Sequence, residues 1–135
     1  MVENYKELIA SVSANTAKLR KGIPDVMQGF NAMAGAAGKD IPDTLRGFSA
    51  MAQAATQAGA LDAQTKELIA MALSVAARCD PCVGYHAKAL VKLGATRAEL
   101  DEMLGMCVYM GGGPSLMYAA AAIAAYEEFG GEKAA

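Results

Sequence analysis

The stretch that organises this chain is Glu67-Leu-Ile-Ala-Met-Ala-Leu-Ser-Val-Ala-Ala-Arg-Cys79-Asp-Pro-Cys82-Val-Gly-Tyr-His86. It holds the single histidine of the sequence, two of the three cysteines, and a glutamate inside an apolar run. Two cysteines separated by two residues can close a small disulfide ring, because this spacing brings the sulfurs together at a turn or a helix start. His86 lies four residues after Cys82, so on a helix the two side chains share a face. We therefore expect the chemistry of the protein here.

The residues before the cysteines predict a helix from about 62 to 77, capped by Asp62. Its side chains are apolar nearly all round, which is typical of a buried central helix. If residues 67 to 86 formed one helix, Glu67 and His86 would lie about 28 Å apart at 1.5 Å per residue. The two can meet only if the chain folds back between Ala77 and Pro81, or if Glu67 comes from another chain. We expect the break, with Glu67 within hydrogen-bond reach of His86.

The residues between the cysteines predict the start of the next helix. Asp80 suits the N-cap and Pro81 the first helical position, which places Cys82 second. The free N–H groups and the helix dipole there favour a thiolate and lower the thiol pKa. Cys79 then falls just outside the helix as the more mobile partner. His86, one turn on, can take the proton from Cys82.

The remaining sequence also predicts helices. A face from Tyr5 to Leu19 marks a first helix, and a repeated Ile-Pro-Asp pattern at residues 23–25 and 41–43 predicts helices over about 24–37 and 42–58. The helix that starts at the cysteines should end at Gly94.

Two more helices are expected towards the C-terminus. Thr96-Arg97-Ala98-Glu99 is a capping box, and the following apolar stripe, which includes Cys107 as a buried core thiol, ends at Gly111-Gly112-Gly113-Pro114. A last helix should run from Pro114 to about Phe129. With no alternating strand pattern, the sequence predicts an all-α bundle of about six to seven helices. We expect a single domain over 1–135, with N-terminal helices in 1–40 and a core over 41–129.

The composition narrows the function classes. Charged residues make up 19% and hydrophobic residues 54% of the sequence, against roughly 25% and 45–50% in a typical domain. A short chain this apolar is expected to bury surface against copies of itself. The net charge of -2 favours neither nucleic acid nor an anionic membrane as a partner. No apolar run reaches the roughly 20 residues needed to span a bilayer, and the N-terminus is not a signal peptide. A cytoplasmic location follows, where a Cys-x-x-Cys serves redox or metal chemistry.

The pattern Glu67, then Cys79-x-x-Cys82-x-x-x-His86, resembles the motif of the alkylhydroperoxidase D-like branch of the carboxymuconolactone decarboxylase family. The flanking Leu61-Asp-Ala-Gln-Thr-Lys-Glu-Leu-Ile and Lys92-Leu-Gly-Ala-Thr96 and the Gly111-Gly-Gly-Pro turn fit as well, so the resemblance covers about residues 41–129. It implies an all-helical bundle in a homo-oligomer and thiol-dependent peroxide reduction. Cys82 would be peroxidatic, Cys79 resolving, and Glu67 with His86 the proton relay. The sequence departs at Pro81, where alkylhydroperoxidase D proteins carry a histidine.

These observations predict a thiol oxidoreductase without cofactor or metal, which reduces a peroxide and is regenerated by an external dithiol. We expect a hexamer built as a trimer of dimers. Three alternatives remain: a disulfide reductase or redox sensor with weak peroxidase activity, a carboxymuconolactone decarboxylase-type enzyme, and a structural metal module. In the last, Cys79, Cys82, His86 and Glu67 would bind Zn²⁺.

Overall fold

The computed structural model describes residues 4–11 and 41–134, and every regular element in these ranges is a helix. A short first helix over residues 5–11 is followed by α3 (Pro42–Thr56), α4 (Ala63–Ala77), α5 (Asp80–Leu93) and α6 (Arg97–Glu128). The all-α prediction is confirmed for this part of the chain. The helix expected over 24–37, and the end of the expected first helix, lie outside the described residues, so the predicted helix number stays a prediction.

The chain divides into two compact units, Met1–Ile9 with Ala58–Ala135, and Ala10–Gln57. The second unit contains α3, which has Pro42 in its first turn and an ion pair between Asp43 and Arg46. None of the residues of α3 is buried. All the residues of the predicted site belong to the first unit, and the expectation of a single domain stays a prediction.

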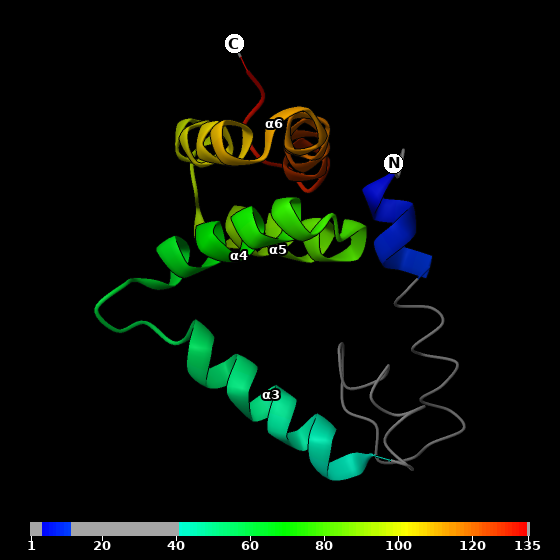
Figure 1. Cartoon of the computed structure of the whole chain (residues 1–135), viewed down its shortest axis with the longest axis vertical. Coiled ribbons are helices and arrows are strands. Elements are labelled where there is room, and N and C mark those ends of the chain that lie inside the picture. Colours follow the sequence, from blue (N-terminus) through cyan, green and yellow to red (C-terminus); the bar gives the residue numbers. More distant parts are fainter. Residues whose placement is uncertain (1–3, 12–40, 135) are drawn as a thin grey trace. The chain divides into compact units, whose positions relative to one another are not determined.

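Helices α4, α5 and α6 pack against one another and form the core of the first unit. In Figure 1 the green α4 and α5 lie side by side, and α6 covers them. Burying a large apolar side chain contributes about 1.5–3 kcal/mol. The core side chains come from all three helices: Met71, Val75, Val83, Ala87, Leu90, Leu100, Leu104, Ala122, Ala125 and Tyr126.

The sequence-based expectation that α4 is buried all round is wrong for the isolated chain. Met71, Ser74 and Val75 are buried, but Leu73 is 63% exposed and Ile69 45% exposed. The reason is that α5 and α6 pack on one side of α4 and leave its other apolar side open within this unit.

Helix α6 folds back on itself at Gly112, whose φ of 67° and ψ of −150° are not helical. A straight helix would place Arg97 and Glu127 about 45 Å apart, yet Arg97 Nη1 donates to Glu127 Oε1 at 2.6 Å. The two helices expected on either side of the glycines are therefore the two arms of α6. By length and composition α6 could cross a membrane, but each arm is shorter than the roughly 20 residues required.

The first helix packs onto α5 and the end of α6. Tyr5 and Ile9 are buried, and the carboxylate of Glu128 accepts hydrogen bonds from the backbone N–H groups of Tyr5, at 2.8 Å, and of Lys6. A carboxylate at this end of a helix is favoured by the dipole. A Cβ at Gly84 would lie 3.0 Å from the Cδ1 atom of Ile9. The glycine between Cys82 and His86 thus allows the first helix to approach α5.

Candidate functional site

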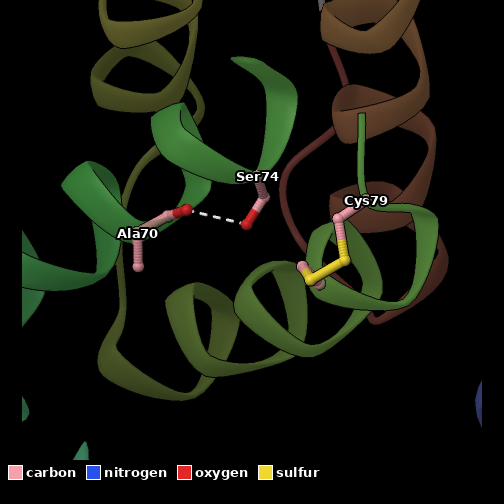
Figure 2. Close-up of a disulfide and its surroundings, with 4 residues drawn as sticks. Ala70, Ser74 and Cys79 are labelled. Carbon is pink, nitrogen blue, oxygen red and sulfur yellow. Dashed lines mark hydrogen bonds between the residues drawn. A yellow bond between two sulfur atoms is a disulfide. The ribbon is translucent and has the colours of Figure 1, made fainter. Parts of the chain in front are cut away.

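Cys79 and Cys82 form a disulfide across the start of α5, with 5.2 Å between their Cα atoms. Both residues are partly buried. The end of α4 positions this turn, because the N–H of Cys79 donates to the carbonyl oxygen of Ser74 at 3.1 Å. Figure 2 shows the disulfide beside the last turns of α4, where the Ser74 hydroxyl in turn donates to the carbonyl of Ala70 at 2.7 Å.

The predicted break between α4 and α5 is confirmed, and a left-handed residue makes it. α4 ends at Ala77, and Arg78 at its C-cap has a φ of 56°. The N–H groups of Arg78 and Cys79 bond to carbonyls of the last turn of α4, a closure that glycine usually provides. Here an arginine adopts this conformation. It directly precedes residues 79–82, the segment closed by the disulfide, which we call the reactive turn.

The predicted N-cap of α5 is wrong by one residue. Cys79, not Asp80, is the N-cap, so Asp80 and Pro81 occupy the first two helical positions and Cys82 the third. The reason is that the carbonyl of Cys79 already accepts the first helical bond, from the N–H of Val83 at 3.0 Å. Cys82 remains within the first turn, where backbone N–H groups lack partners in the helix. No side-chain hydrogen bond caps the start of this helix.

Glu67 and His86 meet as predicted. Glu67 Oε2 lies 2.7 Å from His86 Nδ1, and the two side chains are 13% and 31% exposed. The contact occurs within one chain because the break at Arg78 lets α4 and α5 run back along each other. A carboxylate at Nδ1 orients the ring and leaves Nε2 for proton transfer. His86 lies one turn after Cys82 on α5, so the pair can serve the disulfide chemistry.

A second polar group includes Asp80, which lies between the two cysteines. One oxygen of Asp80, Oδ1, and the hydroxyl of Tyr5 are both buried without a hydrogen-bond partner. Burial raises the pKa of Tyr118, and the charge and hydrogen bonding of Asp80 raise it further. The charge of Arg78 lowers it. Burial, and then the charges of Asp80, Tyr118 and Glu128, raise the pKa of Tyr5 to about 12. Both tyrosines therefore stay protonated as potential donors beside the Asp80 carboxylate.

The third cysteine is not part of the disulfide. Cys107 is partly buried on α6, and its Sγ atom lies 3.5 Å from Met103 Sδ. Burial raises the pKa of its thiol. This is the environment expected of a packing residue.

The metal-module alternative receives no support from the geometry. The two sulfurs are bonded to each other, and Glu67 is paired with His86. Across residues 4–11 and 41–134, no group of three or more His, Cys, Asp and Glu side chains could hold a metal ion.

Sequence reasoning brought together Glu67, Cys79, Cys82 and His86 but missed Tyr5 and Tyr118. Tyr5 is separated from Asp80 by most of the chain, and Tyr118 lies in the second arm of α6. Only the apolar periodicity of the first helix marked Tyr5 as buried, and nothing indicated which residue its hydroxyl faces.

The model of the "Carboxymuconolactone decarboxylase family" matches residues 42–125. An uncharacterized protein of Cupriavidus necator is 48% identical over 73 residues, which cover 54% of this chain and 65% of that protein. An uncharacterized protein of Haemophilus influenzae is 38% identical over 88 residues, or 65% of this chain and 62% of its own length. The matches thus span just under two thirds of these relatives.

Two solved structures are similar in sequence and fold. A carboxymuconolactone decarboxylase family protein from Legionella pneumophila is 49% identical, with a TM-score of 0.74 over 95% of this chain and 98% of that one. One from Thermotoga maritima, for which a part in the antioxidative response has been suggested, is 32% identical. Its TM-score is 0.59 over 63% of this chain and 73% of that chain.

Proposed function

Because this chain belongs to the carboxymuconolactone decarboxylase family, we propose that it is a thiol-dependent oxidoreductase that reduces peroxides through Cys79 and Cys82. The observation that carries the proposal is the Cys79–Cys82 disulfide at the start of the helix that also bears His86, paired with Glu67. A disulfide one helical turn before the histidine of a carboxylate–imidazole pair has both an electron store and a proton carrier within α5.

The cycle begins with both cysteines reduced. The Cys82 thiolate attacks one peroxide oxygen, the O–O bond breaks, and the leaving oxygen takes a proton from the His86 side. The products are an alcohol or water and a sulfenic acid on Cys82. The Cys79 thiol then attacks this sulfur, loses its proton and expels water, which forms the disulfide. An external dithiol restores both thiols by exchange and is itself oxidised to a disulfide.

The position of each group supports these roles. Cys82 lies in the first turn of α5, where the helix dipole favours an anion. Cys79, at the N-cap, stands at the junction with the break, so it can move towards the sulfenic acid. Glu67 is mostly buried and holds the imidazole on the face of α5 that also carries Cys82.

Peroxide consumption by the reduced protein tests the proposal. Hydrogen peroxide and an organic hydroperoxide should each be consumed catalytically when a suitable dithiol is supplied from a panel of donors. The disulfide should return once per turnover. Reduced protein that consumes no peroxide with any donor, yet forms and loses its disulfide reversibly, would instead support the disulfide reductase or redox sensor. Pro81, at a position where alkylhydroperoxidase D proteins carry a histidine, favours this second candidate.

Decarboxylation of a lactone is the poorer candidate, although the family takes its name from it. The reaction has no use for a disulfide-forming pair, and the two cysteines form a disulfide at the start of α5. Conversion of carboxymuconolactone by the purified protein would restore this candidate.

We also propose a homo-oligomer, in the form of a hexamer, located in the cytoplasm. Large apolar side chains of α4 and α6 are exposed in the single chain: Ile69, Leu73, Met106, Tyr109, Met110, Leu116 and Met117. Many exposed large apolar side chains on two helices are typical of an interface. A cytoplasmic location supplies the reducing dithiols that the cycle consumes.

A further inference from the structure

The first helix carries a buried hydroxyl, that of Tyr5, which packs near the start of α5. Tyr5 is 1% exposed, and its hydroxyl has no hydrogen-bond partner. Asp80 Oδ1 is likewise buried without a partner. The Tyr5 ring packs against the same face of α5, since a Cβ at Gly84, one turn after Asp80, would lie 3.4 Å from its Cδ1 atom. Buried polar groups without partners are costly and rare in folded proteins. Two such groups at the start of α5, a donor and an acceptor, call for an explanation.

The disulfide restricts the position of one of the two groups. Asp80 lies inside the ring that the Cys79–Cys82 bond closes, followed there by the rigid Pro81. Its backbone is thereby held at both ends. Its carboxylate also acts on Tyr118, whose pKa is raised by burial and then by the Asp80 charge. Reduction opens the ring and lets the backbone at Asp80 rotate. Tyr5, on the first helix, keeps its position.

The first helix is the fixed end. Glu128 binds its N-terminal N–H groups, and Ile9 packs against Gly84 of α5. The Tyr5 side chain is part of the same core cluster as Val75 and Val83. The hydroxyl is therefore presented to the turn by a rigid support, and Asp80 is the partner that can move.

We propose that Tyr5 is a positioning residue for the reactive turn, and that its hydroxyl donates to Asp80 Oδ1 when the Cys79–Cys82 disulfide is reduced. The reduced state then gains a hydrogen bond that the disulfide state lacks. Docking of the first helix and reduction of the disulfide stabilise each other, because linkage between two equilibria is reciprocal. The proposal deepens the proposed function, and rests on it only in requiring that the disulfide opens and closes reversibly.

The dithiol–disulfide equilibrium of Tyr5→Phe tests this directly, measured in redox buffers of defined potential. The substitution removes the hydroxyl and keeps the ring. We expect the equilibrium to shift about tenfold towards the disulfide, equivalent to a reduction potential about 30 mV more negative. Tyr126→Phe is the matched control, since Tyr126 is also 1% exposed and its hydroxyl donates to the Ala95 carbonyl instead. It should lower thermal stability and leave the potential unchanged.

Asp80→Ala completes a double-mutant cycle. If Tyr5 acts through Asp80, then Tyr5→Phe should have no further effect on the potential in the Asp80→Ala background. Amide exchange over residues 5–11 should also slow on reduction of the wild type, and not of Tyr5→Phe. Equal potentials for wild type and Tyr5→Phe, an equal shift in Tyr126→Phe, or an undiminished shift in the Asp80→Ala background would each overturn the proposal.

The experiments distinguish failure of the peroxidase proposal from failure of the proposed role of Tyr5. A protein with a reversible disulfide that consumes no peroxide refutes the peroxidase, and the comparison of potentials can still be made. A peroxidase whose potential is unaffected by Tyr5→Phe refutes only the role of Tyr5.

Discussion

The Nδ1 atom of His86 lies 2.7 Å from the Oε2 atom of Glu67, although 19 positions separate the two residues in sequence. This contact couples α4 to the helix that carries Cys82. It also orients the imidazole ring, because a ring nitrogen bonded to a carboxylate fixes which nitrogen is left for proton transfer.

Glu67→Gln should therefore slow the reaction with peroxide without unfolding the protein. Glutamine keeps the shape and one hydrogen bond, but it removes the charge that stabilises an imidazolium. We expect the rate of sulfenic acid formation to fall roughly tenfold, and by more in His86→Ala, since a general acid or base contributes about 10²–10⁴-fold. Stopped-flow single turnovers provide the measurement. Wild-type rates in both variants would exclude the pair from the reaction.

The two cysteines should differ in their products. Cys82→Ser should abolish peroxide consumption, because the nucleophile is lost. Cys79→Ser should consume about one peroxide per site and then over-oxidise, because no thiol remains to condense with the sulfenic acid. Mass spectrometry distinguishes the products, and Cys107→Ser is the matched control that should turn over normally. A sulfenic acid trapped on Cys79 in the Cys82→Ser variant would reverse the roles.

The buried hydroxyl of Tyr5 should make the protein sensitive to alkali. The pKa of Tyr5 is raised from 10.0 to about 12 in the folded state, so the unfolded chain releases this proton first. The contribution of the Tyr5 proton to the free energy of unfolding is fully present below pH 10, and it is lost as the pH rises through 12. Tyr5→Phe should lose less stability over this window than the wild type. Urea unfolding at pH 8 and pH 11 gives the comparison, and parallel losses in the two proteins would contradict the assignment.

The fold of α6 should depend on Gly112. Its φ of 67° and ψ of −150° lie in a region that only glycine adopts readily. Gly112→Ala should therefore destabilise the protein by about 1–3 kcal/mol. Gly113→Ala is the matched control, because a Cβ there meets nothing within 4 Å, and alanine favours helix by up to about 1 kcal/mol. Urea unfolding should shift in opposite directions for the two variants.

The exposed apolar residues should lie in an interface between copies of the chain. Tyr109 and Met110 are 78% and 76% exposed in the single chain. Sedimentation at micromolar concentration should show an oligomer for the wild type and smaller species for Met110→Glu, because the charge cannot be buried without a partner. Unchanged helicity by circular dichroism would show that the variant still folds. A wild type that sediments as a monomer would refute the oligomer.

The sequence by itself determined the features that depend on near neighbours. The Asp62 cap, the capping box of Thr96 and Glu99, and the end of α4 at Ala77 were all predictable and are present. Each rests on contacts between residues three or four positions apart, which a linear pattern records. The approach of Glu67 to His86 also followed, because a break between two helices of known length lets their side chains meet.

Only the tertiary structure decided which distant groups share the reactive turn. The contact of Tyr5 with Glu128 spans 123 positions, and the Tyr5 ring packs against Gly84 of α5. The fold of α6 at Gly112 brings Arg97 to Glu127. The apolar pattern of α4 also did not predict which side of this helix is exposed in the single chain. Such features depend on how helices pack over long sequence separations, and helix periodicity specifies which face is apolar but not what, if anything, covers it.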